Sequence, residues 1–159
     1  MSDIFDYLGY EIPSLIVEQV DPNKMKTMAA ILRDPYPVHW DKDANETLGL
    51  KGRVINQGPL NLSYIANMLM AWQGPACIKR LQARFLKPVL DGDTVIAGGK
   101  ITEIIDSEES RVRAKVWLSR DNEIVLEGEA EIHSFVPKHP LCEQALDKGM
   151  RKLLILILC

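Results

Sequence analysis

Several residue types and patterns are scarce in this chain of 159 residues. It has 3 cysteines, Cys77, Cys142 and Cys159, which are too scattered to have metal-ligand spacing. The residues from Met1 to Ile4 lack the basic and apolar regions of a secretory signal. The longest apolar run, Leu153–Cys159, is far shorter than the roughly 20 residues of a membrane-spanning helix. We therefore expect a cytoplasmic protein with reduced thiols, no metal site and no membrane span.

The charge balance also lacks an excess of one sign. There are 19 Lys and Arg residues against 22 Asp and Glu, which gives a net charge of −3 without a basic cluster. Binding to nucleic acid needs a concentrated positive face, so this class is excluded and we expect a small-molecule or protein partner. Because 47% of the residues are hydrophobic and 26% charged, the chain is neither disordered nor fibrous, and we predict a single domain over residues 1–159 with short terminal extensions.

The first half of the chain contains signals for a strand and a helix. An apolar strand is expected at Leu15–Val17, after Pro13. Asp21 before Pro22 is typical of a helix start, because the carboxylate caps the helix and proline suits its first position. The apolar residues that follow at helical spacing are Met25, Met28, Ala29 and Leu32. Pro35 and Pro37 prevent the helix from continuing, so we predict that it ends near Arg33.

A second helix is predicted over Pro59–Trp72, where almost every side chain is apolar. A helix that is apolar nearly all round has to be enclosed by other parts of the structure. The Gly74-Pro75 pair ends it.

From residue 78 to 135 the hydrophobic pattern alternates with a period of two, which predicts strands. In the last two strands, one side of each carries an apolar row: Val112, Ala114, Val116 and Leu118, and then Ile124, Leu126, Ala130 and Ile132. The opposite sides carry a basic row and an acidic row: Arg111, Arg113 and Lys115, and then Glu127, Glu129 and Glu131. A two-residue loop would set Val112 against Glu131, so we predict a three-residue loop at Arg120–Asn122 or Asp121–Glu123.

These elements together predict an α+β fold. We expect an antiparallel sheet of about five strands that curls around the central helix.

The main candidate site lies in the loop after the first helix. Pro35 and Pro37 stiffen the segment that separates Asp34 from His39, so the carboxylate and the imidazole can be held in one relative geometry at little entropic cost. Such a pair is suited to moving a proton to or from carbon. Taken alone the pattern favours a structural role, because a histidine in such a loop is usually hydrogen-bonded and Asp before Pro is a common turn former.

The segments that follow strengthen the catalytic interpretation, because this loop resembles that of the MaoC-like acyl-CoA hydratase/dehydratase family of hot-dog folds. The family motif reads approximately Asp-x-Asn-Pro-(Ile/Leu)-His-x-Asp, and the matching residues are Asp34, Pro37, Val38, His39 and Asp41. The resemblance covers roughly residues 20 to 135 and continues through Ala44, Gly49, Gly58, Arg84–Val89 and Gly92–Thr94. It differs at Tyr36, where the family has Asn, and at Gln57, where His is common.

The resemblance implies an enzyme that reversibly adds water across the double bond of a trans-2-enoyl thioester, in a syn sense and without metal or organic cofactor. Asp34 and His39 would hold the attacking water, one removing its proton and the other helping to protonate the α-carbon. Gly58 would donate its backbone N–H to the thioester oxygen, which suits the start of a buried helix. The substrate would be carried by coenzyme A or an acyl carrier protein.

Other residues are candidates for binding the substrate. Tyr36, Gln57 and Ser63 are expected to shape or support the substrate pocket, and Arg84 and Lys87 are candidates for the phosphates of coenzyme A. Each has a plainer alternative: Ser63 can cap or pack, Gln57 can support the site without chemistry, and alternating basic residues on a strand are usually solvated.

Two other functions stay open at this point. The same fold can place a carboxylate beside a thioester carbonyl, as in a thioesterase. The chain can also be a non-catalytic subunit or acyl-binding module, although retention of both Asp34 and His39 speaks against this. A homodimer or larger assembly is expected, and the tract from Trp72 to Phe85 is similar to the small chains of heteromeric members that act on steroid-side-chain thioesters, so a second kind of subunit is also considered.

Overall fold

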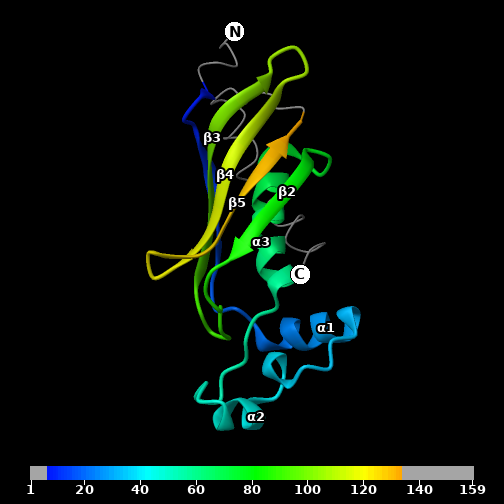
Figure 1. The fold of residues 1–159 in the computed structure, drawn as a ribbon, viewed down its shortest axis with the longest axis vertical. Coiled ribbons are helices and arrows are strands. Elements are labelled where there is room, and N and C mark those ends of the chain that lie inside the picture. Colours follow the sequence, from blue (N-terminus) through cyan, green and yellow to red (C-terminus); the bar gives the residue numbers. More distant parts are fainter. Residues whose placement is uncertain (1–6, 134–159) are drawn as a thin grey trace, which may run out of the picture.

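The computed structural model describes residues 7–133, and within them one antiparallel sheet dominates the molecule (Figure 1). The strand order is β1-β3-β4-β5-β2. The strands in that order are β1 (Glu11–Val17), β3 (Val95–Asp106), β4 (Arg111–Arg120), β5 (Glu123–Ile132) and β2 (Ile78–Phe85). The sheet of about five strands that the alternating pattern predicts is confirmed.

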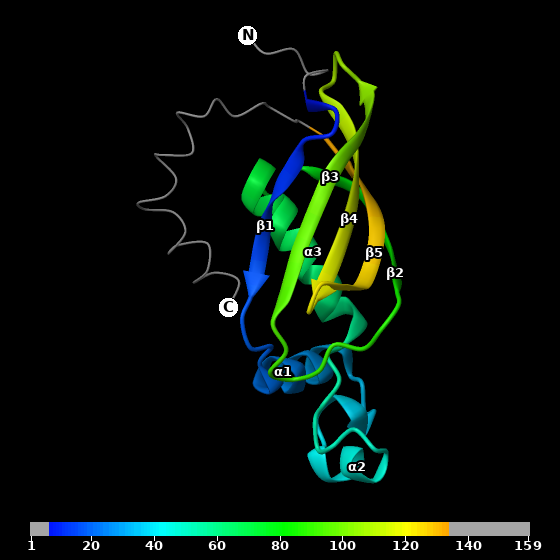
Figure 2. The same ribbon diagram turned by 90° about the vertical axis from the view of Figure 1, so that its left-hand side faces the viewer.

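The helix α3 (Gly58–Gln73) lies along one face of this sheet, which curves around it (Figure 2). It contacts the edge strands β1 and β2 as well as β3 and β4 between them, which confirms the expected α+β arrangement. One face of α3 is buried, through Leu60, Asn61, Tyr64, Ile65, Met68, Leu69 and Trp72. The opposite face, with Leu62, Ser63, Ala66, Asn67 and Met70, is half-buried. Enclosure of the helix is therefore seen for one face only within the described residues.

The helix α1 (Pro22–Leu32) begins and ends as its sequence predicts. The Asp21 carboxylate accepts a hydrogen bond of 2.8 Å from the backbone N–H of Asn23. Arg33 follows the last helical residue with a left-handed backbone (φ 52°), and its N–H bonds back to the last turn. The next two helices, η2 (Pro37–His39) and α2 (Lys42–Thr47), lie with α1 at one end of the molecule, beyond the end of the sheet (Figure 1).

The strand β1 begins four residues earlier than Leu15, the start predicted from the sequence. Pro13 lies within it, at an irregularity of the pairing between Ile12 and Leu15. Proline is tolerated there because β1 is an edge strand and the bulge leaves one N–H out of the ladder.

The loop between β4 and β5 is shorter than predicted. It contains two residues, Asp121 and Asn122, because Arg120 pairs with Glu123. The predicted three-residue loop is wrong. Both loop residues adopt left-handed backbone angles, with φ of 50° and 62°, as a type I′ turn requires.

A β-bulge reconciles this short loop with the amphipathic pattern of the strands. Leu118 pairs with Leu126, so Val125 is an extra residue that shifts the register by one. Beyond the bulge, Arg113 pairs with Glu131, and the basic row lies beside the acidic row as predicted. This is the register that a loop at Asp121–Glu123 would have produced.

No helix in the described part of the chain is long and apolar enough to cross a membrane. The predictions that concern Cys142, Cys159 and the apolar run Leu153–Cys159 lie outside the described residues.

Candidate active site

The segment from residue 33 to 57 joins α1 to α3 and carries the candidate catalytic pair. A buried side chain holds it together: Asn45 is 0% exposed, and its Nδ2 donates hydrogen bonds of 2.9 Å to the carbonyls of Val38 and Arg53. Asp41, a member of the recognised motif, caps α2 by accepting from the N–H groups of Asp43 and Ala44 at 3.0 Å each. Asp41 therefore orders the loop, and its capping oxygen is already occupied.

Asp34 is held at two points directly after α1. Its N–H donates to the carbonyl of Ala29 at 2.9 Å, and its Oδ1 accepts from the N–H of Tyr36 at 3.0 Å. This local turn leaves Oδ2 free of backbone donors and directs it toward His39.

His39 faces Asp34 with a defined ring orientation. Its Nδ1 lies 2.8 Å from the carbonyl oxygen of Ile55, and its Nε2 lies 3.5 Å from Asp34 Oδ2. Because a carbonyl only accepts, Nδ1 carries the proton, and in the neutral ring Nε2 carries the lone pair. The His39 and Asp34 side chains are 15% and 30% exposed, so both can be reached from solvent. Two proton acceptors therefore face one another at an accessible site.

Gly58 is the first residue of α3, so its N–H has no acceptor within the helix. The ring of Phe85 lies against it: a Cβ built on Gly58 would be 3.1 Å from Phe85 Cζ. Any larger residue at position 58 would press on this ring, because this distance is shorter than an ordinary van der Waals contact.

Gln57 directly precedes α3 and connects the start of this helix to α1. It is 1% exposed, and its Nε2 donates to the carbonyl of Met25 in α1 at 2.9 Å. Its Oε1 is buried and has no hydrogen-bond partner among the described residues. Gln57 thus connects α1 to α3, in line with the plainer alternative of a support for the site.

A buried polar cluster that sequence reasoning missed lies next to Gln57. Asn56 Nδ2 donates to Asn61 Oδ1 at 2.6 Å and lies 3.5 Å from the Tyr64 hydroxyl. Burial raises the pKa of Tyr64, against the smaller lowering effect of its hydrogen bond with Asn56. The only sequence signal for this cluster is a pair of amides at positions 56 and 61 flanking the apolar helix.

The remaining predicted binding residues lie in different settings. Tyr36 is 60% exposed and contacts His39 edge to face, with ring centroids 6.2 Å apart. Ser63 Oγ donates to the carbonyl of Leu60 at 2.7 Å, within its own helix. Arg84 is paired with Glu127 at 2.7 Å, and Lys87 is paired with Glu123. The two basic candidates therefore already have anionic partners.

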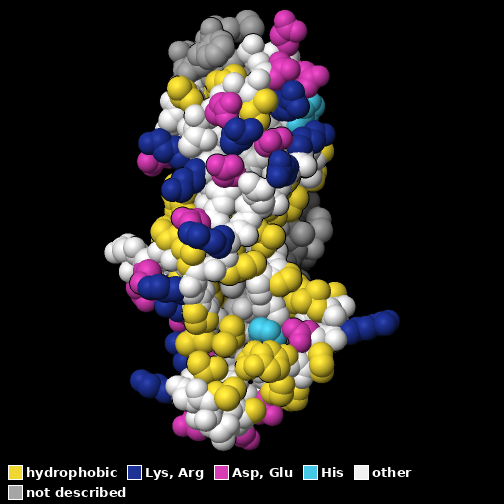
Figure 3. Space-filling view, in the orientation of Figure 1, with side chains coloured by type: hydrophobic (Ala, Val, Ile, Leu, Met, Phe, Trp, Pro, Cys, Tyr) yellow, Lys and Arg dark blue, Asp and Glu magenta, His cyan; other side chains and the backbone are white. Residues whose placement is uncertain are grey.

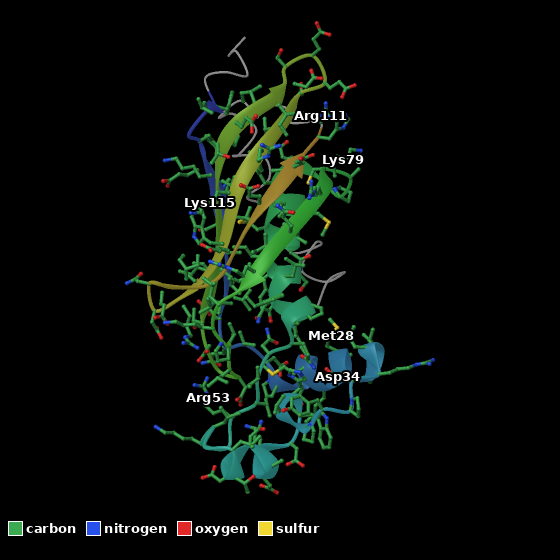
Figure 4. All side chains as sticks on the ribbon, in the orientation of Figure 1. Met28, Asp34, Arg53, Lys79, Arg111 and Lys115 are labelled. Carbon is green, nitrogen blue, oxygen red and sulfur yellow. The ribbon has the colours of Figure 1, made fainter. Side chains whose placement is uncertain are left out.

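A groove of about 650 Å³ opens beside Asp34 and along α1. The residues that line it are Lys26, Ala29, Ala30, Arg33, Asp34, Pro35 and Trp40. Figure 3 shows hydrophobic side chains gathered at this end of the molecule, around a histidine and a carboxylate. Figure 4 places Asp34 at this end, away from Lys79, Arg111 and Lys115, which lie along the sheet. Within the described residues, no three His, Cys, Asp or Glu side chains are grouped to hold a metal ion.

Comparisons with known proteins agree with this architecture. The fold is the hot-dog fold, with an antiparallel sheet around a central helix. Residues 13–121 match the family described as MaoC like domain, and the chain belongs to that family. A search of curated proteins finds no match.

Solved structures with the same fold include three of similar extent. The R-hydratase PhaJ1 from Pseudomonas aeruginosa superposes with a TM-score of 0.71 at 23% identity, over 84% of this chain and 89% of that one. The ChsH1-ChsH2 complex from Mycobacterium tuberculosis gives 0.68 at 23%, over 79% and 96%. The (R)-hydratase from A. caviae involved in PHA biosynthesis gives 0.68 at 20%, over 79% and 94%.

Proposed function

We propose that this chain is an enoyl-thioester hydratase or dehydratase, which adds water reversibly and with syn geometry to a trans-2-enoyl-CoA. The observation that carries the proposal is the pair of facing acceptor atoms, Asp34 Oδ2 and His39 Nε2, 3.5 Å apart at an accessible site. Membership of the MaoC-like family and the hydratases among the structures with the same fold support it. No metal or organic cofactor is part of the proposed chemistry.

The geometry of the pair limits where a reacting water can bind. A water in line between two acceptors needs them roughly 5.6 Å apart, about twice an ordinary hydrogen-bond length. Because the Oδ2 and Nε2 atoms are 3.5 Å apart, the water must lie beside the pair and donate one hydrogen to each atom. Its oxygen then presents a lone pair away from both side chains, toward an enoyl β-carbon on the open side.

The reaction balances over this pair. The water oxygen bonds to the β-carbon while one of the two side chains takes a proton from the water. The thioester becomes an enolate, and a proton from the pair is then delivered to the α-carbon on the same face. The pair returns to its starting state, so water adds across the double bond with no other reactant.

The developing enolate charge needs a hydrogen-bond donor. We infer that the N–H of Gly58 supplies it, because this group begins a 16-residue helix whose N-terminal end favours negative charge. One fixed donor of this kind is worth roughly 3 to 4 kcal/mol in a transition state. Phe85 would then limit the space above the thioester.

Replacement of the pair tests the proposal. We expect Asp34→Asn and His39→Ala each to lower kcat for crotonyl-CoA hydration by about 10² to 10⁴, since each removes a proton acceptor from the water. The measurement is the loss of enoyl-thioester absorbance, with longer enoyl-CoAs tested in parallel. Asp43→Asn, which changes an exposed carboxylate on α2, is the matched control and should retain wild-type turnover.

The same assay separates the alternatives. Undiminished turnover in both site variants would remove the assigned roles from Asp34 and His39. Release of free thiol from a saturated acyl-CoA, without a change in enoyl absorbance, would indicate a thioesterase instead. Binding of acyl-CoA with turnover only after a second protein is added would indicate a subunit of a heteromeric enzyme.

We further propose that the active species is a dimer or larger assembly. The half-buried face of α3 is mostly apolar, and one structure with the same fold is a complex of two named components. Light scattering on the active fraction gives its mass and shows whether one kind of chain suffices.

A further inference from the structure

We propose that the groove on α1 binds the phosphate-bearing arm of the coenzyme A thioester, with Lys26 and Arg33 as the residues that contact its phosphates. This inference rests on the proposed function, because it assigns the anionic part of the same substrate. It places the phosphates on α1 and away from Arg84 and Lys87, the candidates from the sequence.

The two cations lie beside Asp34 in one groove. Lys26, Ala29 and Ala30 share one side of α1 at helical spacing, and Arg33, which follows the last helical residue, lines the same groove with Asp34. The two cations are seven residues apart, or about 10 Å along a helix axis. A ligand that lies in the groove therefore reaches Asp34 at one end and passes both cations.

The groove also carries positive charge that is unpaired within the described residues. Neither Lys26 nor Arg33 has an ion-pair partner among residues 7–133, whereas Arg84 and Lys87 are each paired with a glutamate. The Asp34 carboxylate alone would repel an anionic ligand, but the two cations give the groove lining a positive balance. Because the whole chain carries −3, this local excess stands out against an acidic background.

The rest of the groove is apolar. Apart from the two cations and Asp34, its lining consists of Ala29, Ala30, Pro35 and Trp40. The pantetheine arm of coenzyme A combines methyl groups with a phosphate at its far end, so it matches a lining that combines apolar side chains with cations. The open groove thus suits the carrier arm, which remains partly in water, better than it suits an acyl chain, which favours an enclosed channel.

The experiment compares two substrates that differ in phosphate. Crotonyl-CoA carries phosphates, and crotonyl-pantetheine carries none. We expect Lys26→Gln and Arg33→Gln each to lower the ratio of kcat/KM for crotonyl-CoA to that for crotonyl-pantetheine by about fivefold, the size of an exposed charge contact. A purely structural role would affect both substrates alike and leave this ratio unchanged.

Two sets of controls accompany these variants. Lys79→Gln removes an exposed cation that lies along the sheet, remote from Asp34 (Figure 4), and should leave the ratio at its wild-type value. Arg84→Gln and Lys87→Gln remove the paired cations on and after β2. A lower ratio in this second pair, with a wild-type ratio in the α1 variants, would overturn the proposal.

Failure of the proposed function would be recognised separately. If wild-type protein turns over neither substrate, calorimetry measures the binding of free coenzyme A to the wild type and to the double variant Lys26→Gln/Arg33→Gln. Binding that weakens about 25-fold, two fivefold effects combined, in the double variant upholds the phosphate site without the hydratase activity. Absent binding, or binding unchanged in the variant, overturns it.

Discussion

The orientation of His39 depends on a residue far from it in the chain. The carbonyl of Ile55, 16 residues later, accepts from Nδ1 and fixes the tautomer that leaves Nε2 facing Asp34. The sequence predicted the Asp34 and His39 pairing from the two intervening prolines and the family motif. It could not predict the acceptor, because a backbone carbonyl is present at every position and leaves no pattern in the residues.

Asn45 is a second fixing point that the sequence did not indicate. Its amide donates to carbonyls on both sides of the loop, and its own Oδ1 is buried with no hydrogen-bond partner in the part of the chain that the structure describes. The residue lies in a short polar helix, where an asparagine looks like any solvated side chain. Only its complete burial reveals that it holds the loop closed.

Asn45→Asp should destabilise the protein although the two side chains have nearly the same shape. A carboxylate cannot donate, so it would face the Val38 and Arg53 carbonyls with acceptors only. We expect a loss of about 2 to 4 kcal/mol in the free energy of unfolding, measured by urea denaturation. Glu46→Gln, on the exposed side of the same helix, is the control. Equal stability of Asn45→Asp and the wild type would mean that the two carbonyls do not depend on this amide.

At the scale of elements, the alternating pattern of β4 and β5 predicted which side chains face one another in this hairpin but not the length of its loop. Directly paired residues must share a face of the sheet, and this rule correctly predicted that the basic row meets the acidic row. It assumed an uninterrupted ladder, however, and so excluded the two-residue loop. The bulge at Val125 breaks that assumption, and its carbonyl also accepts from the N–H groups of Leu86 and Lys87 after β2.

Asn122→Gly should stabilise this hairpin. Asn122 has a φ of 62°, and glycine adopts this left-handed conformation without the Cβ penalty. We expect a gain of about 0.5 to 1 kcal/mol, seen as a higher midpoint of thermal unfolding. Asn23→Gly in the right-handed first turn of α1 is the matched comparison and should lower the midpoint. A lower midpoint for Asn122→Gly would contradict the turn assignment.

At the scale of the whole molecule, charged side chains connect residues 33–57, the segment that carries the candidate site, to the sheet. Asp93 lies just before β3 and accepts from Arg53 at 2.6 Å and from Arg120 at 2.9 Å. Asp91 accepts from Lys42 of α2 at 3.0 Å. The sequence did not predict these partners, since ion pairs between distant segments depend on how the elements pack. The positions of core residues, helices and strands can be predicted from the periodicity of hydrophobic residues, whereas ion pairs between distant segments cannot.

The stability of the protein should therefore depend on pH through Asp93. Burial alone would raise the pKa of this carboxyl, but the Leu90 N–H, Arg53 and Arg120 together outweigh burial and lower it. A carboxyl with a lower pKa in the folded state stabilises it above the unfolded pKa of about 4 and loses this effect as the pH falls through the folded pKa.

Asp93→Asn checks this dependence. We expect the free energy of unfolding at pH 7 to fall by about 1 to 2 kcal/mol, a modest loss because both arginines are partly exposed to solvent. Between pH 5 and pH 3 the stability of the variant should decline less than that of the wild type. Urea denaturation across this pH range measures both effects. Asp43→Asn should keep the wild-type pH profile, and an unchanged acid slope in Asp93→Asn would exclude Asp93 as its source.

The site segment from residue 33 to 57 lies outside the ladder of paired strands. Its backbone meets the rest of the chain at a few points, among them the bonds of Asn56 with Val89 and of Val54 with Asp91. Neither β4 nor β5 contributes to the groove. Exposed positions of this segment can therefore vary while the sheet and α3 keep their packing, whereas buried members such as Asn45, Val54 and Gln57 cannot. Divergence between relatives can be concentrated at those exposed positions.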